Sequence, residues 1–214
     1  MSRFAILLGG GLVRTPRLDA QVAGARVIAA DSGIRYAASL GVTPELWVGD
    51  FDSVPPVLPA HYADIPRKTF PHEKDKTDGE LAIDEALGLG ATSLMLCGAF
   101  GGQRADHEFL HLALAVQLAE AGIEVTLTSG SQEGFPLLPG TTEFDYEDGT
   151  LFSILGFSEL FGLSVESAKW PLHNVEVAFG SSLTISNETR GRLRISLERG
   201  RAVLLAHPYP LPEY

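Results

Sequence analysis

The first two-thirds of the chain alternates short apolar runs with segments in which apolar residues recur at helical spacing. We interpret the apolar runs as strands at residues 4–9, 25–30, 46–50, 93–99 and 124–129. Several are apolar at nearly every position, which is typical of a parallel sheet covered on both faces. Helical spacing occurs at residues 33–41, 78–90 and 105–122. This alternation predicts an α/β domain with a mostly parallel sheet.

After Pro139 the pattern changes to short β-rich segments separated by glycine or by paired polar residues. These segments are 150–157, 162–168, 173–179, 182–188, 192–198 and 201–208. Such spacing is typical of an antiparallel sandwich or barrel, and of the two we expect an all-β sandwich. We place the boundary near residue 136, so the chain is expected to consist of an α/β domain (1–135) followed by a β-sandwich (136–214).

The apolar N-terminal stretch "FAILLGGGLV" is too short to span a membrane and leads directly into domain-like sequence. We therefore interpret it as a first buried strand. The sequence contains no transmembrane segment by the same criterion.

The chain carries a formal charge of −11, from 16 Lys and Arg against 27 Asp and Glu. This balance argues against nucleic acid or an anionic membrane as a partner, because both would repel it. A phosphorylated small ligand remains compatible where a metal ion or a local basic group offsets the charge. The single cysteine, Cys97, fits a reducing, cytoplasmic setting, and its apolar neighbours favour a small buried side chain over a nucleophile.

The candidate functional residues lie at the carboxyl ends of the predicted parallel strands. Open α/β sheets bind ligands at this edge. Glycines 9–11 follow the first strand and would let the backbone approach a phosphate, although a plain turn gives the same pattern. Asp31 follows the second strand, and Gly33 opens a helix. Asp31 fits either a ligand-binding carboxylate or a helix cap.

The stretch "GDFDS" places Asp50 and Asp52 two residues apart after an apolar run. In an extended chain the two carboxylates would point to the same side and repel each other unless a cation lay between them. The alternative is that Asp50 caps a turn, Asp52 is solvated and Phe51 belongs to the core.

Two further motifs precede helices. In "KDKTD", Asp75 and Asp78 are three residues apart, so one helical turn would bring them to a common face. Alternatively, Thr77 or Asp78 caps the helix and the lysines are solvated. In "GGQRADH", Arg104, Asp106 and His107 lie between a strand and a long helix.

Oxygen ligands of this kind select a hard cation, and Mg²⁺ in particular favours a few carboxylates plus substrate phosphates. The sequence shows no His and Cys cluster at zinc spacing and no GxxxxGK[ST] loop. Its "GGGLVRTP" stretch also lacks the GxGxxG pattern.

The motifs "ADSG", "GDFDS", "DKTD" and "GGQRADH", in this order, resemble those of the thiamine pyrophosphokinase family. The C-terminal "AKWPL" (168–172) and "SNE" (186–188) resemble the second domain of that family. The chain departs from the family pattern at Ser32 and Arg35, where glycine and asparagine are common, and this affects the details of the nucleotide loop.

The resemblance implies an α/β nucleotide domain, a β-sandwich and a homodimer. It implies transfer of a pyrophosphoryl group from ATP to the hydroxyl of thiamine, with Mg²⁺ as cofactor. A Mg²⁺-dependent phosphohydrolase and a non-catalytic sensor of thiamine phosphates are the rival interpretations. The four carboxylates Asp50, Asp52, Asp75 and Asp78 weigh against the sensor.

The same resemblance implies roles for individual residues. The metal ligands would be Asp50, Asp52, Asp75 and Asp78. The catalytic residues would be Asp50, Asp52, Asp78 and Asp106, with Asp78 or Asp106 accepting the hydroxyl proton. Nucleotide contacts are expected from Gly10, Asp31, Ser32, Gly33, Ser53, Lys76, Thr77, Arg104 and His107.

Thiamine would be bound by Lys169, Trp170, Ser186 and Asn187, in a pocket completed by a second copy of the chain. A flat, partly cationic heterocycle suits the face of Trp170, and Ser186 and Asn187 would supply hydrogen bonds to the pyrimidine ring. The alternatives are that Trp170 plugs the sandwich and that "SNE" is an ordinary turn.

Overall fold

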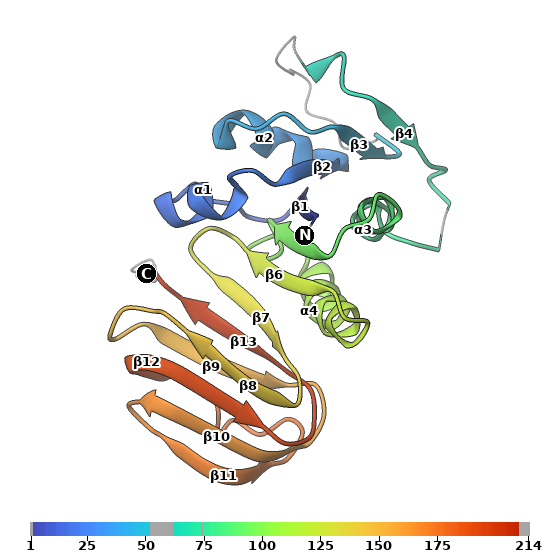
Figure 1. Cartoon of the computed structure of the whole chain (residues 1–214). Coiled ribbons are helices and arrows are strands. Elements are labelled where there is room, and N and C mark those ends of the chain that lie inside the picture. The colour runs from blue at the N-terminus through green and yellow to red at the C-terminus, as the bar shows by residue number, and fades with distance from the viewer. Residues whose placement is uncertain (1, 52–61, 74, 210–214) are drawn as a thin grey trace. The chain divides into compact units, whose positions relative to one another are not determined.

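The computed structural model describes residues 2–51, 62–73 and 75–209 (Figure 1). The chain divides into two compact units. The first comprises Met1–Phe109 and Gly122–Gly130, and the second comprises Leu110–Ala121 and Ser131–Tyr214. Each unit has its own hydrophobic core.

The first unit is built on a parallel sheet with the strand order β6-β5-β1-β2-β3-β4. Its strands are β1 (Arg3–Leu7), β2 (Arg26–Ala30), β3 (Leu46–Gly49), β4 (Arg67–Thr69), β5 (Ser93–Cys97) and β6 (Glu124–Thr128). Its helices are α1 (Pro16–Val22), the short 3₁₀ helix η1 (Asp31–Ile34), α2 (Arg35–Leu40), α3 (Asp78–Gly88) and the start of α4 (Ala105–Glu120).

Both faces of this sheet are buried, as the continuous apolar runs predict. On one face, Ala5, Val27 and Trp47 join a core that includes Leu18 of α1 and Leu40 of α2. Residues that alternate with these along the strands are also buried, and α3 contacts β1, β2 and β3. The predicted α/β domain with a parallel sheet is therefore confirmed.

The helices begin where capping residues satisfy the first backbone amides. Thr15 accepts a hydrogen bond from the Leu18 amide, and Pro16 occupies the first turn of α1, a helix that the sequence analysis does not predict. At α3, Thr77 and Glu80 form a reciprocal capping box. Of the two capping residues considered for this helix, Thr77 is the one found.

Cys97 lies at the end of β5 and is fully buried. Burial raises the pKa of its thiol to about 12. Because the thiolate is the reactive form, the expectation of a small, inert, buried side chain is confirmed.

The second unit consists of antiparallel strands together with most of α4. The strands are β7 (Glu133–Leu137), β8 (Gly140–Phe144), β9 (Leu151–Gly156), β10 (Leu160–Ala168), β11 (Leu172–Val177), β12 (Asn187–Leu197) and β13 (Ala202–His207). The predicted all-β sandwich is confirmed.

Strand β12 belongs to both layers of the sandwich. Its first residues, Asn187 and Glu188, pair with β9, which pairs in turn with β13 and through it with β7. The remainder of β12 pairs with β8 and β10. Inward-facing residues of both layers, such as Phe152, Leu163 and Ile195, share one core.

Two parts of the second unit differ from the expected pattern. Strands β7 and β8 lie within residues 133–144, for which no strand is predicted. The segment 182–186, expected to begin a strand, forms turns instead, and β12 starts at Asn187. Within the described residues, no helix is long and apolar enough to span a membrane.

Candidate functional site

The carboxyl ends of all six parallel strands meet at one edge of the first unit. The order in which the chain adds strands to the sheet reverses between β1 and β5. Strands β2, β3 and β4 are added on one side of β1, and β5 and β6 are then added on the other. Open α/β sheets bind ligands outside such a switch point. The loops that follow β1 and β5 are therefore the natural centre of a nucleotide site.

These two loops are joined by backbone hydrogen bonds. The amide of Gly10 donates to the carbonyl of Gly98 at 3.2 Å, and the amide of Gly11 donates to that of Phe100 at 2.7 Å. A Cβ atom on Gly10 would lie 2.3 Å from the Gly98 oxygen. The glycines thus allow the two loops to approach each other closely, with the Gly10 amide hydrogen-bonded between them.

Asp31 begins η1, directly after β2. Ala30 is the N-cap residue of η1, and Asp31 is the first residue of the helix. The residue has a left-handed backbone with φ 41°, and its carbonyl accepts a hydrogen bond of 2.9 Å from Trp47 Nε1. Ser32 follows, with its hydroxyl oxygen 2.7 Å from the position that a Cβ on Gly9 would occupy.

Gly33 lies against the end of β1, where a Cβ atom would be 2.1 Å from the carbonyl oxygen of Leu7. Because that oxygen belongs to the backbone of a buried strand, it has little freedom to move. We expect Gly33→Ala to destabilise the protein by about 1–3 kcal/mol. For a chain of this size that is a fall in Tm of several degrees, which differential scanning calorimetry would measure.

Gly88, in α3, provides the matched control, because a Cβ there meets nothing within 4 Å. Gly88→Ala should leave Tm unchanged or raise it, since alanine favours the helix by up to about 1 kcal/mol. Equal melting of Gly33→Ala and the wild type would show that η1 is not held against β1.

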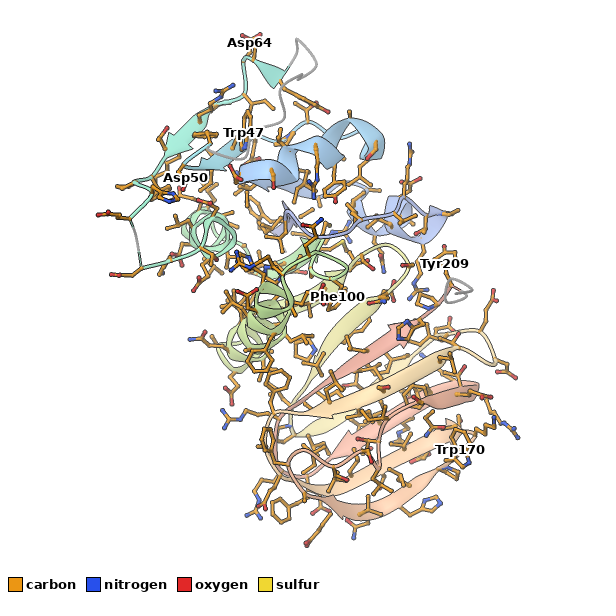
Figure 2. All side chains as sticks on the ribbon, turned by 180° about the vertical axis from the view of Figure 1, so that it is seen from behind. Trp47, Asp50, Asp64, Phe100, Trp170 and Tyr209 are labelled. Atoms are coloured by element: carbon orange, nitrogen blue, oxygen red, sulfur yellow. The ribbon has the colours of Figure 1, made fainter. Side chains whose placement is uncertain are left out.

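Asp50 directly follows β3, on which Trp47 lies (Figure 2). Its side chain is 13% exposed, and one carboxylate oxygen lies 3.0 Å from Nδ1 of His72, whose side chain is 78% exposed. Next to it, Phe51 packs edge-on against Trp47 with ring centroids 5.0 Å apart. Phe51 is partly buried and packs against the core, which is the part of the alternative interpretation that concerns this residue.

The extended geometry assumed for Asp50 and its neighbours is wrong at Phe51, which has a left-handed backbone with φ 64°. The chain turns there so that the phenyl ring enters the core. Asp52 and Ser53 lie outside the described residues.

Asp31 and Asp50 come from neighbouring strand ends. Ala30 pairs with Val48 in the parallel ladder, and a Cβ on Gly49 would lie 3.2 Å from the Cα and Cβ atoms of Asp31. Asp31 therefore lies beside Gly49, the residue before Asp50, and both aspartates lie at the same edge of the sheet, as expected from their positions after β2 and β3.

The segment before α3 differs from its predicted geometry. Because Thr77 caps the helix and Asp78 is its first residue, Asp75 lies before the helix, and the two aspartates do not share a helical turn. Asp75 is exposed and Asp78 is partly buried. Lys76 Nζ is bound to Asp84 at 2.5 Å.

Arg104 and Asp106 form a two-pronged ion pair at the start of α4. Nε of Arg104 lies 2.9 Å from one carboxylate oxygen of Asp106, and Nη2 lies 2.5 Å from the other. The hydrogen bond from the guanidinium lowers the pKa of Asp106 to about 2. A carboxylate held in this way is a weak base near neutral pH. His107, in the same first turn, donates its amide to the Arg104 carbonyl at 3.1 Å.

The described residues contain no group of three or more His, Cys, Asp or Glu side chains close enough together to hold a metal ion. Asp50, Asp75 and Asp78 are therefore not preassembled as one set of ligands. Mg²⁺ does not require such a set, because it is commonly bound by one or two carboxylates plus substrate phosphates. The donor chemistry at Asp50 fits that mode.

Trp170, one of the candidate thiamine residues, lies at the surface of the second unit (Figure 2). Trp170 is 54% exposed, and Lys169 Nζ lies 4.6 Å from the centre of its ring. Because the ring is so exposed, the alternative in which Trp170 plugs the sandwich is wrong.

Asn187 is buried and holds the backbone of Trp170 with its side-chain amide. Its Oδ1 accepts the Trp170 amide at 3.1 Å, and its Nδ2 donates to the Trp170 carbonyl at 2.8 Å. Ser186, beside it, is exposed and has φ 61°. The hydrogen bonds of Asn187 thus hold the segment of Lys169 and Trp170 against the segment of Ser186 and Asn187.

Several contacts of the candidate residues are not predicted from the sequence. His72 binds Asp50, Glu188 binds Lys169 at 2.6 Å, and Glu108 accepts the Gly102 amide at 2.9 Å. These contacts carry no local sequence signal. The capping box of Thr77 and Glu80 does carry one, in the spacing T-x-x-E.

Both units of the chain match known protein families. Residues 22–127 match the model of the thiamin pyrophosphokinase catalytic domain, and residues 141–201 match that of the thiamin pyrophosphokinase vitamin B1 binding domain. Together the two models match more than three quarters of the chain.

Individual relatives agree with this result. The thiamine pyrophosphokinase of Bacillus subtilis is 28% identical over 192 residues, covering 83% of this chain and 85% of the relative. A crystal structure of the Bacillus subtilis protein has the same fold, with a TM-score of 0.82 at 24% identity over 96% of this chain and 98% of that one. That of thiamin pyrophosphokinase from Geobacillus thermodenitrificans gives 0.74 at 28% identity, covering 97% of each chain. The chain belongs to the thiamine pyrophosphokinase family.

Proposed function

We propose that the protein transfers the pyrophosphoryl group of ATP to the hydroxyl of thiamine, yielding thiamine diphosphate and AMP. The observation that carries this proposal is the family match in both units, one to a catalytic domain and one to a vitamin B1 binding domain. The juxtaposition of Asp31 and Asp50 at the sheet edge supports it. We assign ATP and Mg²⁺ to the α/β domain (1–135) and thiamine to the sandwich (136–214).

The metal would be held by Asp50 and Asp52, with Asp75 and Asp78 reaching it once substrate is bound. When bound, Mg²⁺ would neutralise negative charge on the phosphates around the attacked β-phosphorus. The rest of catalysis is then alignment of the thiamine hydroxyl with the phosphate chain, together with electrostatic stabilisation.

Asp78 is the better of the two candidate bases for the thiamine hydroxyl. Asp106 is already bound by Arg104 through three hydrogen bonds, and its lowered pKa makes it a weak proton acceptor. Asp78 lies at the first position of α3, where the capping box fixes its backbone. We assign Arg104 and Asp106 to nucleotide binding and positioning.

For the nucleotide, we propose contacts from the loops after β1, β2, β3 and β5 and from the start of α3. These residues are Gly10, Asp31, Ser32, Gly33, Ser53, Lys76, Thr77, Arg104 and His107. Lys76 would exchange its exposed partner Asp84 for a phosphate, a change of low cost because exposed ion pairs contribute little stability.

For thiamine, we propose that Trp170 stacks on a ring of the substrate and that Lys169 and Ser186 supply polar contacts. Asn187 fixes the Trp170 backbone, since both polar atoms of its side-chain amide are engaged there. A second copy of the chain is proposed to complete the pocket in a homodimer, and the enzyme is proposed to be cytoplasmic.

The test is to incubate the purified protein with ATP, Mg²⁺ and thiamine and to separate the products by chromatography. AMP and thiamine diphosphate should form in equal amounts, and only when all three components are present. ADP or free phosphate would instead identify a phosphohydrolase, and unchanged ATP would identify a sensor. Repeating the reaction with a chelator tests the metal requirement.

A further inference from the structure

A feature of the first unit outside these assignments is the position of Arg35. It is the first residue of α2, directly after η1, and its side chain is exposed. Its Nη2 donates to the carbonyl of Gly9 and, at 3.3 Å, to that of Gly10. The guanidinium therefore lies on the loop that follows β1, beside the switch point of the sheet.

Arg35 is hydrogen-bonded to the protein through one nitrogen of its guanidinium, Nη2. Nη2 also lies 3.1 Å from the hydroxyl of Tyr36, and the guanidinium carbon lies 4.8 Å from the centre of the Tyr36 ring. Within the described part of the chain, the Nε and Nη1 groups of Arg35 make no hydrogen bond. These N–H groups remain available to an acceptor outside the protein.

Among the residues that the structure describes, no carboxylate pairs with Arg35. All its contacts are with neutral groups: two carbonyls, a hydroxyl and an aromatic ring. By contrast, Lys76 is paired with Asp84 and Arg104 with Asp106. Of these three cations near the nucleotide site, Arg35 is the one that needs no displaced carboxylate before it binds an anion.

An available cation matters here because the surroundings are acidic. The chain has a formal charge of −11, and Asp31 and Asp50 lie at the same sheet edge. Such a site repels a nucleoside polyphosphate unless positive groups offset the carboxylates. A guanidinium suits phosphate oxygens because its N–H groups form paired, charge-assisted hydrogen bonds.

We propose that Arg35 binds the phosphate chain of the nucleotide, with its Nε and Nη1 groups facing phosphate oxygens while Nη2 stays on the glycine loop. This inference rests on the proposed function, because it assumes that the nucleotide occupies the switch point. It adds a binding residue to the nucleotide contacts proposed above.

Isothermal titration calorimetry with Mg²⁺·ATP and with adenosine tests the proposal on Arg35→Gln and Arg35→Lys. Arg35→Gln should weaken Mg²⁺·ATP about fivefold, a modest loss for a charged hydrogen bond because the group is exposed. Adenosine affinity should not change. Arg35→Lys should recover part of the loss, since it keeps the charge.

Tyr36→Phe is the matched control, because the Tyr36 hydroxyl also donates to the Gly10 carbonyl but carries no charge. It should bind Mg²⁺·ATP like the wild type. Two results would overturn the proposal: a loss of adenosine affinity in Arg35→Gln, or an equal loss of Mg²⁺·ATP affinity in Tyr36→Phe. Either would show that Arg35 only stabilises the loop after β1.

The outcomes separate this inference from the proposed function. If the wild type binds Mg²⁺·ATP and Arg35→Gln binds it equally well, the role of Arg35 is wrong and the proposed function stands. If the wild type binds no Mg²⁺·ATP, the proposed function fails, and this inference fails with it.

Discussion

Asp50→Asn should abolish turnover while leaving the fold intact. Asparagine has nearly the same volume as aspartate and can still accept a hydrogen bond from His72, so local packing should survive. It lacks the negative charge with which Asp50 would hold a metal–phosphate complex. We expect kcat/KM to fall at least about a thousandfold, because charge stabilisation of this kind contributes several kcal/mol.

The melting temperature without ligand should stay the same or rise, since the substitution removes one negative charge from a sheet edge that also carries Asp31. Asp64→Asn is the matched control: Asp64 is an exposed carboxylate of the same unit that lies apart from Asp50 (Figure 2). It should retain wild-type activity. An active Asp50→Asn enzyme would refute the metal assignment.

Trp170→Ala should raise the KM for thiamine about tenfold or more, while the KM for ATP hardly changes. The indole is 54% exposed, so its removal should cost little stability. The backbone at this position should not move, because Asn187 binds the amide and carbonyl rather than the ring. The variant therefore isolates the loss of an aromatic face.

Two further variants give this experiment its controls. Trp170→Phe should recover much of the affinity, since a smaller aromatic face remains. Phe161→Ala removes another aromatic ring of the same unit that also lies beneath a cation, with Arg199 3.9 Å from its centre, but outside the proposed pocket. It should leave the KM for thiamine unchanged. A parallel rise of both KM values in Trp170→Ala would contradict a thiamine-specific role.

The parallel strands of the first unit are predicted from the sequence to within about two residues at their ends. This succeeds because strands buried on both faces are apolar at nearly every position. β4 is not predicted, since its three residues are exposed and carry no such pattern. Strand β7 is interrupted by Gly134 and Pro136, and four of the five residues of β8 are exposed.

The candidate site is predictable in its location but not in its contacts. The rule that ligands bind at the carboxyl ends of parallel strands identifies Asp31 and Asp50 from strand positions alone. The contacts of His72 with Asp50 and of Arg35 with Gly9 join residues more than twenty positions apart, so no local pattern encodes them. The turn at Phe51 is not predictable from the sequence for a similar reason, since it depends on the packing of the Phe51 ring against Trp47.

The burial of Cys97 bears on how the enzyme tolerates its chemical environment and on how it can be studied. Oxidants and electrophiles react with accessible thiolates, and the single cysteine of this chain is fully buried with its thiol held in the protonated form. Catalysis should therefore be insensitive to peroxide at levels that inactivate thiol enzymes. For the experimenter, a cysteine introduced at any exposed position becomes a unique attachment point for a fluorophore or spin label, without prior removal of the natural one.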